Sequence, residues 1–549
     1  MIILEGKNIK KYYGERKILD IKNIRIYEGD RIGVVGVNGS GKTTLMNILS
    51  MRDLPDEGDI DIKGKISYIT QLGTPENKEM DYKLKGEFKV DYDNRDTLSG
   101  GEKTRFKLAE GLSTNPNLLL LDEPTSNLDI DGINVLTEKL QEFQGAILII
   151  SHDRNLLDNI VDKIIEVEDG EIKEYSGNYS DYKEHKEAMR VRQEFEYEKY
   201  VKEKGRLTQI IQERQGHAKT MKKTPTRMGN SEARLHRANT RQIQGKIHNT
   251  INAIETRIEK LDKKEKPKEI ERVKIDMPSV TNLRNRLLID GNKISKSFGD
   301  KILFKNSELK IFNGDKAALL GNNGTGKTTL INMILEGDEK LKICKNLKVG
   351  YFSQKLDILE GDKTILENVM KNSIQNETTA RTLLSRLLFK REDIKKNIEV
   401  LSGGERVKVA FAKIFLSDIN FIILDEPTNY LDIPSIEALE EVLLEYEGSL
   451  LLVTHDKTFI DRVANKIITI EDKKIRIFNG WYSEYIERQE NKINFGQEED
   501  EKKLLVLQNR MSEVMGKLSL MPSDEEKIIL DKEFNQLVKE INSLKIKLG

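Results

Sequence analysis

The sequence predicts an α/β protein with two tandem phosphate-loop domains, joined by an antiparallel α-helical hairpin linker and followed by a C-terminal helical hairpin. Three observations lead to this prediction. A set of short motifs occurs twice, at matching spacing, along the 549 residues. In both copies a glycine-rich loop follows a buried-strand run and opens a helix. Highly charged segments with helical spacing of apolar residues separate and follow the two copies.

Composition limits the protein classes that fit. Lys and Arg total 91 and Asp and Glu total 92, so the formal net charge is −1 and any basic surface must be local. The single cysteine, Cys344, excludes a disulfide framework and a metal site built from several cysteines. The chain has no apolar run long enough to cross a bilayer, and its N-terminus does not resemble a signal peptide. We therefore expect a cytoplasmic protein.

The repeated motifs keep their spacing. GVNGSGKT at residues 36–43 recurs as GNNGTGKT at 321–328, and LSGGE at 98–102 recurs at 401–405. LLDEPT at 120–125 recurs as ILDEPT at 423–428, and SHD at 151–153 as THD at 454–456. One stretch differs, because Gln71 stands much closer to Ser99 than Gln354 does to Ser402. The chain is therefore a tandem duplication whose first copy is about 20 residues shorter in this stretch.

A charged segment lies between the copies, and its apolar residues have helical spacing: Ile243, Ile247, Ile251, Ile254, Ile258 and Leu261. Pro225 and Gly229 predict a turn, so we expect a hairpin with its apex near residues 216–230. The expected domains are 1–184 for the first phosphate-loop domain, 185–286 for the linker, 287–489 for the second domain and 490–549 for a C-terminal helical extension.

The C-terminal extension is expected to form a second hairpin. Two apolar stripes are interrupted at residues 521–523, and Ser523 with Glu526 fits a capping box that restarts the helix. Because its charges are balanced, a packed or bracing hairpin is favoured over an RNA contact.

Each glycine-rich loop has the context of a phosphate-binding loop. The backbone N–H groups and the helix N-terminus are expected to face bound phosphates, with the loop lysine on the β- and γ-phosphates and the threonine on Mg²⁺. The predicted nucleotide-binding residues are Gly36, Asn38, Gly39, Gly41, Lys42, Thr43 and Thr44 in the first copy. In the second copy they are Gly321, Asn323, Gly324, Gly326, Lys327, Thr328 and Thr329.

A pair of carboxylates ends a buried apolar strand in each copy, at the strand edge where ligands bind. Asp122 and Asp425 fit the Mg²⁺ shell, together with Thr43 and Thr328. The following glutamates can orient and polarise an attacking water, and a histidine at the same spacing in both copies ends another apolar strand. A structural histidine is the alternative for that position. The candidate catalytic residues are Glu123, Glu426, His152 and His455.

With the Leu-Ser-Gly-Gly-Glu element included, the two motif sets resemble the ATP-binding cassette family, and the resemblance covers both repeats. The resemblance implies that a monomer hydrolyses ATP, with two ATP molecules in a head-to-tail sandwich of its own cassettes. It implies that signature residues contact the γ-phosphate of the opposite repeat: Ser99, Gly101, Ser402 and Gly404. It also implies that Tyr13 and Phe298 stack on adenine, with strand packing as the alternative. Gln71 and Gln354 would sense Mg²⁺ and the γ-phosphate.

Within that family, the order cassette, helical linker, cassette resembles the ABC-F branch, including NYLD at residues 429–432. A transporter ATPase pair would need membrane partners, and the branches with a cysteine-ligated cluster or zinc cysteines do not fit a single cysteine. The resemblance implies that the partner is the bacterial 70S ribosome. ABC-F proteins act in its exit site, where the linker reaches toward the 23S rRNA and the peptidyl-site tRNA.

The charge of the linker supports an RNA partner independently. Residues 214–246 contain nine Lys or Arg and one acid, Glu232, for a local charge of +8. A solvated charge run, the alternative, usually mixes both signs, so this segment favours contact with phosphate-rich RNA. The candidate RNA-binding residues are Lys219, Lys222, Lys223, Arg227, Arg234, Arg237 and Arg241.

Among ABC-F proteins, the short first cassette, the extended apex at 219–234 and the C-terminal hairpin resemble the resistance group. The resemblance implies displacement of lincosamides, pleuromutilins and streptogramin A from the ribosome, with release on ATP hydrolysis. Two alternatives stay open. One is a housekeeping ABC-F factor that regulates translation without drug resistance, and the other is a DNA-associated ATPase whose hairpin is a dimerisation arm.

Overall fold

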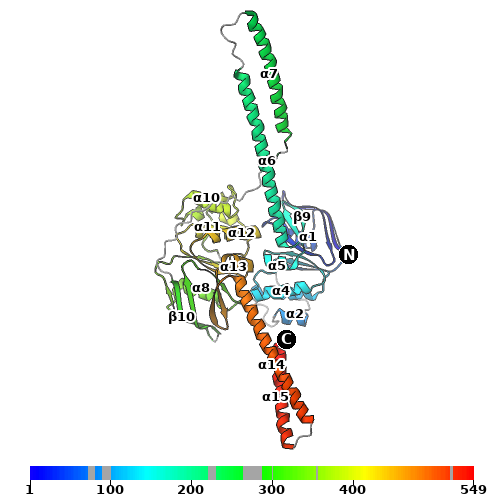
Figure 1. The fold of residues 1–549 in the computed structure, drawn as a ribbon, viewed down its shortest axis with the longest axis vertical. Helices are drawn as coiled ribbons and strands as arrows, with labels where there is room; N and C mark the ends of the chain where they lie inside the picture. The colour runs from blue at the N-terminus through cyan, green and yellow to red at the C-terminus, as the bar shows by residue number, and fades with distance from the viewer. Residues whose placement is uncertain are drawn as a thin grey trace. The chain divides into compact units, whose positions relative to one another are not determined.

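The computed structural model describes residues 1–71, 81–88, 100–220, 230–261, 263, 287–299, 301–353, 356–519 and 524–548 (Figure 1). The chain divides into two compact units. The first comprises Met1–Asn127, Gly132–Lys274 and Leu388–Arg391. The second comprises Leu128–Asp131, Ile275–Leu387 and Glu392–Gly549.

The first cassette contains two sheets. The larger has the order β5-β6-β7-β3-β8-β9 and is parallel except for β9: Ile66–Ile69, Leu118–Asp122, Ala146–Ile150, Arg31–Val35, Lys163–Glu168 and Glu171–Ser176. The smaller is antiparallel with the order β2-β1-β4: Arg16–Tyr27, Ile2–Tyr13 and Glu57–Ile62. The helices α1 to α5 are Lys42–Leu49, Tyr82–Glu87, Gly100–Ser113, Ile130–Glu142 and Arg154–Ile160. Strands β6 and β7 are buried at every residue, as expected for unbroken apolar runs in a parallel sheet.

The second cassette repeats this plan. Its larger sheet has the order β14-β15-β16-β12-β17-β18: Val349–Phe352, Phe421–Asp425, Ser449–Val453, Lys316–Leu320, Lys466–Glu471 and Lys474–Asn479. Its smaller sheet has the order β11-β10-β13: Lys301–Phe312, Leu287–Phe298 and Leu341–Ile343. Helices α8, α11, α12 and α13 are Lys327–Glu336, Gly403–Phe415, Ile433–Glu445 and Lys457–Val463. The prediction of two tandem α/β domains with phosphate loops is confirmed.

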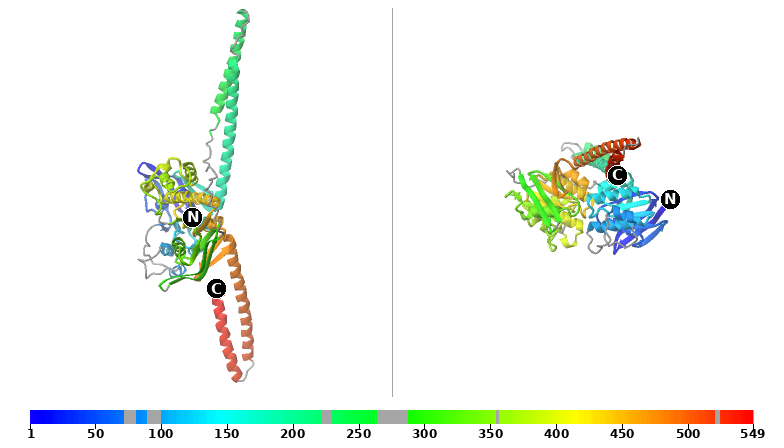
Figure 2. Two further views of the ribbon diagram at one scale, coloured as in Figure 1. Left: turned by 90° about the vertical axis from the view of Figure 1, so that its left-hand side faces the viewer. Right: turned by 90° about the horizontal axis from the view of Figure 1, so that it is seen from below.

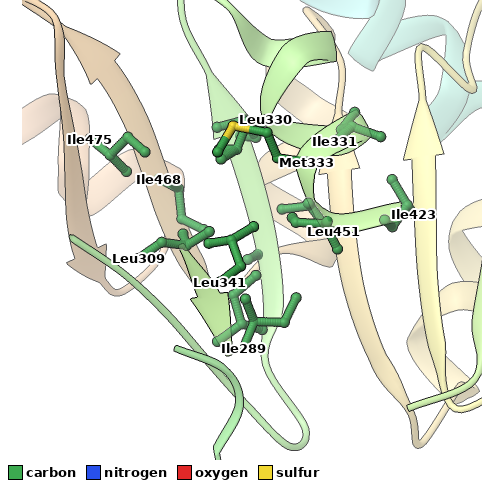
Figure 3. Packing of buried hydrophobic residues seen from close by; sticks show 14 of the residues in the cluster. Ile289, Leu309, Leu330, Ile331, Met333, Leu341, Ile423, Leu451, Ile468 and Ile475 are labelled. Carbon is green, nitrogen blue, oxygen red and sulfur yellow. The ribbon is translucent and has the colours of Figure 1, made fainter. Parts of the chain in front are cut away.

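One buried cluster joins the small sheet, the phosphate-loop helix and the large sheet of the second cassette (Figure 3). Ile289 and Leu309 enter it from the small sheet, Leu330 from α8, and Ile423 and Leu451 from the large sheet. Because protein interiors are close-packed, this contact fixes the helix that begins at the phosphate loop against the strands that carry the other site residues.

The stretch that is longer in the second repeat contains additional helices. Between Gln354 and Ser402 lie α9, α10 and the 3₁₀ helices η2 and η3: Ile365–Met370, Glu377–Arg386, Asp393–Lys395 and Ile398–Val400. Helix α9 begins with a capping box in which Thr364 and Glu367 bond reciprocally. In the first repeat, the described part of this region contains α2.

The linker contains two paired helices, α6 (Tyr179–Thr220) and α7 (Asn230–Glu259), which run side by side in Figures 1 and 2. Leu207 and Ile211 of α6 and Ile251 of α7 are buried, and Glu203 pairs with Arg257 at 3.4 Å. The expected stripe is only partly buried, since Ile243 is 45 % exposed. The N-terminal half of α6 carries exposed apolar side chains because α7 ends opposite Glu203: Met189, Phe195 and Val201.

A second helical pair ends the chain, formed by α14 (Tyr482–Ser519) and α15 (Asp524–Leu548). Val514, Leu537 and Ile541 are buried between them, and Arg510 donates to Glu533 at 2.8 Å. The predicted C-terminal hairpin is therefore present. The expected capping box falls outside the described side chains, because Ser523 is not described and nothing is stated of the Glu526 side chain.

Partly buried hydrogen bonds attach α6 to the first cassette. The Tyr182 hydroxyl donates to Glu166 Oε1 at 2.8 Å, the Tyr175 hydroxyl to Oε2 at 3.1 Å, and Lys186 Nζ also reaches this carboxylate at 2.9 Å. Glu166 lies on β8, and burial together with its charge raises the pKa of Tyr182. The contacts of Tyr182 and Lys186 lie in the first turns of α6, which begins at Tyr179, within the range expected for the first cassette.

The second cassette attaches α14 in a related way. The Tyr485 hydroxyl donates to Glu471 Oε1 at 2.9 Å, and Ser483 N donates to Asp461 at 2.8 Å. In the first cassette the corresponding donor is Ser180 N, which donates to Asp158 at 2.8 Å. The linker arm and the C-terminal arm are therefore equivalent elements of the two repeats.

Among the described helices, none combines the length and apolar character needed to cross a bilayer.

Replacing Glu166 with Ala should lower the free energy of unfolding by about 1–3 kcal/mol, because it leaves a partly buried tyrosine hydroxyl and a lysine without their acceptor. Urea unfolding followed by tyrosine fluorescence measures this loss. Glu174→Ala is the matched control, since Glu174 on β9 is exposed and pairs with Lys163 at 3.5 Å. It should cost no more than about 0.5 kcal/mol. Equal losses in the two variants would contradict the role of Glu166 as the anchor.

Candidate nucleotide-binding sites

The first phosphate loop connects β3 to α1. Gly36, Gly39 and Gly41 have φ values of 153°, 77° and 104°, which side chains rarely adopt. A Cβ on Gly36 would lie 2.5 Å from the backbone oxygen of Val167, so glycine is required there. Lys42 Nζ donates to the carbonyl oxygens of Gly36 at 2.7 Å and Val37 at 3.1 Å. The lysine is therefore held over the loop that is expected to enclose phosphates.

The second loop, between β12 and α8, has nearly the same geometry. Gly321, Gly324 and Gly326 have φ values of 153°, 77° and 108°. Lys327 Nζ donates to the carbonyl oxygens of Gly321 at 2.6 Å and Asn322 at 3.2 Å. Burial lowers the pKa of Lys327, and the nearby charge of Glu426 opposes this effect.

Asp122 ends β6 in the first cassette, and Asp425 ends the equivalent strand β15 in the second. Burial raises the pKa of both carboxyls, while a hydrogen bond from Thr43 opposes the rise at Asp122. The Tyr68 hydroxyl lies 3.5 Å from Asp122 Oδ2, and the Tyr351 hydroxyl lies 3.5 Å from Asp425 Oδ2. The structure thus brings the loop threonine and the aspartate of the first repeat together, as a shared Mg²⁺ site requires.

Glu123 adopts a left-handed backbone conformation with φ 51°, which is uncommon outside glycine. Its N–H donates to the carbonyl oxygen of Ile150 at 2.9 Å, which fixes the turn after β6. Its carboxyl lies 3.2 Å from His152 Nε2 and accepts from the His152 backbone N–H at 3.3 Å. Burial and the nearby charge of Asp122 raise the pKa of Glu123 to about 8.

The second repeat reproduces this arrangement at Glu426, whose φ is 50°. Its Oε1 lies 3.3 Å from His455 Nε2, and its N–H donates to the carbonyl oxygen of Val453 at 2.8 Å. Burial and Asp425 raise the pKa of Glu426 to about 8. Burial, with the charge of Lys327, lowers the pKa of His455 to about 4, so this imidazole is neutral at pH 7. Burial disfavours the charged form of both groups, so a neutral imidazole next to a protonated carboxyl is the favoured state in this buried position.

The other predicted nucleotide-site residues are the two aromatic residues, the glutamines and the signature residues, and some of them fall outside the described residues. Tyr13 is 53 % exposed at the end of β1 and Phe298 is 60 % exposed at the end of β10, which excludes ordinary strand packing for both. Gln71 is exposed after β5, and Ser402 caps α11 through a reciprocal bond with Glu405. Gly101 and Gly404 are buried near the starts of α3 and α11. The predicted residues that fall outside the described residues are Ser99, Gln354, Lys222, Lys223 and Arg227.

The remaining predicted residues are placed only in part. Among the RNA candidates, Lys219 is exposed on α6, and the side chains of Arg234, Arg237 and Arg241 on α7 are not described. Asn38 and Asn323 lie in the two phosphate loops, and Thr44 and Thr329 in the first turns of α1 and α8.

Sequence reasoning missed the two tyrosines beside the strand-end aspartates. Tyr68 and Tyr351 each lie three residues before a glutamine already singled out, Gln71 or Gln354, so the repeat itself contained a signal. Alignment of the two copies in register would have found the pair. Among the described residues, no cluster of three or more His, Cys, Asp or Glu side chains forms a metal site.

Two phosphate loops, two strand-end carboxylate pairs and two signature helices on one chain define a tandem ATP-binding cassette ATPase. The chain matches the family described as ABC transporter over residues 19–126 and 304–429. An archaeal structure, a model of ribosome-bound Pelota and ABCE1, has a TM-score of 0.56 and 21 % identity. The match covers 86 % of this chain and 78 % of the archaeal chain, and it shows the fold alone.

Relatives matched over most of their length identify the branch. The ribosome protection protein VmlR of Bacillus subtilis is 33 % identical, with 98 % of this chain and 97 % of that protein covered. The erythromycin resistance ATP-binding protein MsrA of Staphylococcus epidermidis is 32 % identical over 84 % and 97 %. The ABC transporter F family member 5 of Arabidopsis thaliana is 31 % identical over 88 % and 77 %. The chain belongs to the ABC-F type of tandem ATP-binding cassette ATPases, which hydrolyse ATP.

Replacing Glu123 and Glu426 together with Gln should nearly abolish steady-state ATP hydrolysis while nucleotide binding is kept. The amide fits the same buried space but cannot polarise an attacking water as a carboxylate does. Phosphate release measures turnover, and a fluorescent ATP analogue measures binding. Glu142→Gln is the control, because its side chain is exposed and pairs with Lys139. Turnover at the level of the unsubstituted protein in the double variant would remove both carboxylates from this role.

The same carboxyls should make stability fall as pH rises. Their pKa lies near 8 in the folded chain against an ordinary 4.5, so the folded state binds more protons between these values. Their stabilising contribution is fully present below about pH 4.5 and is lost as pH rises through about 8. Thermal unfolding without nucleotide, from pH 5 to 9, should show a flatter pH dependence in the double Gln variant. Parallel profiles for the two proteins would contradict the raised pKa values.

Proposed function

We propose that this chain binds the exit site of the bacterial 70S ribosome in its ATP-bound state and displaces antibiotics from near the peptidyl transferase centre. The apex of the linker would act on the drug site, and ATP hydrolysis would release the protein. The proposed drug classes are lincosamides, pleuromutilins and streptogramin A.

The linker carries the main support for this proposal. Residues 214–246 have a local charge of +8 in a chain whose net charge is −1. The described flanks of this segment are exposed at Arg214, Lys219 and Lys246. Helix α6 has 42 residues, so at 1.5 Å per residue it is about 63 Å long. A long paired arm with concentrated positive charge is suited to reach a phosphate-rich partner.

The names of two relatives support the same function. One is a ribosome protection protein and the other an erythromycin resistance protein, and each match covers 97 % of the relative. The similarity to the plant F family member supports the second candidate, a housekeeping factor that regulates translation without affecting drugs.

The residues of the nucleotide sites receive proposed roles. Glu123 and Glu426 would orient and polarise the attacking water, with His152 and His455 beside the γ-phosphate. Bound Mg²⁺ would supply charge neutralisation, held by threonine, aspartate and glutamine oxygens: Thr43, Asp122 and Gln71, or Thr328, Asp425 and Gln354. Tyr13 and Phe298 would stack on the adenine base, and the signature residues would contact the γ-phosphate.

Shortening the linker apex should separate drug protection from nucleotide chemistry. Replacing residues 221–229 with a two-glycine turn should abolish the rise in inhibitory concentration in a susceptible bacterium while ATP binding is retained. Co-sedimentation with ribosomes, in the Glu123→Gln and Glu426→Gln background, should stay largely unchanged. An apex-shortened protein that binds ribosomes and still protects fully would favour the housekeeping candidate.

The charges of the apex supply a second arm of this test. Lys222, Lys223 and Arg227 replaced together with Gln should weaken ribosome binding, and each lost phosphate contact should lower the salt slope by about 0.7–0.9. Lys263, Lys264 and Lys266 replaced with Gln are the control, because they remove the same charge from the mixed-sign run at 263–274. If the two triple variants weaken ribosome binding equally, net charge alone explains the effect and the apex makes no specific contact.

A further inference from the structure

An exposed aromatic ring ends the first strand of each cassette, but only one of the rings carries a polar group. Tyr13 and Phe298 occupy equivalent positions at the ends of β1 and β10. The Tyr13 hydroxyl donates to Asp53 Oδ2 at 3.2 Å. Phe298 has no hydroxyl and cannot form such a bond. The two candidate adenine-stacking rings therefore differ in how they are held.

Asp53 is itself fixed by a lysine. Its Oδ1 accepts from Lys11 Nζ at 2.8 Å, and the same ammonium donates to the backbone oxygen of Leu54 at 2.7 Å. The hydrogen bond raises the pKa of Lys11 and lowers that of Asp53, so both are charged at neutral pH. Lys11 Nζ also lies 5.8 Å from the centre of the Tyr13 ring. The Tyr13 hydroxyl therefore donates to a carboxylate that Lys11 itself holds in place.

The same segment is tied to the helix of the phosphate loop. Asp53 N donates to the carbonyl oxygen of Asn47 in α1 at 3.1 Å. Tyr12 N, next to the aromatic residue, donates to Asp56 at 2.6 Å. The ring that would hold the base and the loop that would hold the phosphates are therefore connected through residues 53–56.

The second cassette contains the lysine and the aspartate, and Asp338 N likewise donates to a carbonyl oxygen of the phosphate-loop helix, that of Met333 in α8, at 3.0 Å. It does not contain the bond from the aromatic ring to the aspartate. Lys296 and Asp338 correspond to Lys11 and Asp53 by the same offset in numbering that relates Phe298 to Tyr13. Lys296 Nζ lies 3.7 Å from Asp338 Oδ2, beyond hydrogen-bond distance. Asp338 Oδ1 instead accepts from the backbone N–H of Lys340 at 3.0 Å. In the second cassette this aspartate therefore stabilises the turn at residues 338–340.

We propose that Asp53 is a positioning residue that orders the Tyr13 ring for the adenine base, so that the first nucleotide site is pre-organised and the second is not. This inference rests on the proposed stacking role of Tyr13 and Phe298. Ordering a side chain before binding removes an entropy cost from the binding step. Loss of the hydroxyl bond should therefore weaken nucleotide binding at the first site by about two- to tenfold.

The experiment measures each site in the full chain with the other one disabled. In a Lys327→Ala background, a non-hydrolysable ATP analogue with a ribose fluorophore reports the first site. Tyr13→Phe, which keeps the ring, should weaken binding by about two- to tenfold, and Asp53→Ala should do the same. Asp53→Ala added to Tyr13→Phe should have no further effect, because the two substitutions remove one interaction.

The repeat offers a matched control. In a Lys42→Ala background, Asp338→Ala should leave binding at the second site unchanged, because Phe298 has no hydroxyl to hold. Equal weakening by Asp53→Ala and Asp338→Ala would overturn the proposal, since both aspartates would then act through their loops. Unchanged affinity in Tyr13→Phe would also overturn it.

Tyr13→Ala separates this inference from the stacking role. If Tyr13→Ala weakens binding and Tyr13→Phe does not, the ring stacks but Asp53 does not position it. If neither substitution changes affinity, the stacking role itself fails.

Discussion

Parallel pairing of the central strands is the constraint on which both nucleotide sites depend. In the first cassette β3 lies between β7 and β8, and β6 pairs with β7, all parallel. Parallel strands end at one edge of the sheet, so the phosphate loop after β3, the carboxylates after β6 and the histidine after β7 meet there. The second cassette keeps the same order. Fully buried apolar strands hold this register, because a shifted strand would misalign its hydrogen bonds and its packing.

The chemistry at that edge requires groups that burial disfavours. Glu123 and Glu426 have left-handed backbones and raised pKa values, and both the backbone conformation and the burial behind the pKa shift cost free energy in the folded protein. The surrounding sheet supplies the compensation through the backbone bonds to Ile150 and Val453. Stored strain at a functional position is common where the structure around it is rigid. Both repeats show the left-handed backbone and the raised pKa at this glutamate, which indicates that its place at the strand end causes both features.

Duplication also explains the two helical arms. Each cassette ends in an antiparallel strand pair followed by a helix whose first turns bond back to the sheet, through Tyr182 in one repeat and Tyr485 in the other. The repeats then diverge in what the equivalent arms carry. The linker arm carries a basic segment, whereas the charge of the C-terminal arm is nearly balanced. Divergence at single positions, such as Tyr13 against Phe298, likewise distinguishes two sites whose phosphate loops are nearly identical.

The sequence by itself determined the duplication, the phosphate loops, the strand-end carboxylates, the histidines and the two helical hairpins, because short motifs and periodic stripes encode them locally. It could not determine contacts between residues far apart in the chain. Tyr68 with Asp122, Tyr182 with Glu166 and Tyr13 with Asp53 meet only after the strands are ordered. The left-handed turns at Glu123 and Glu426 also could not be predicted, since no local preference favours that conformation in glutamate. Only the tertiary structure imposes it, through the bonds that close each strand end.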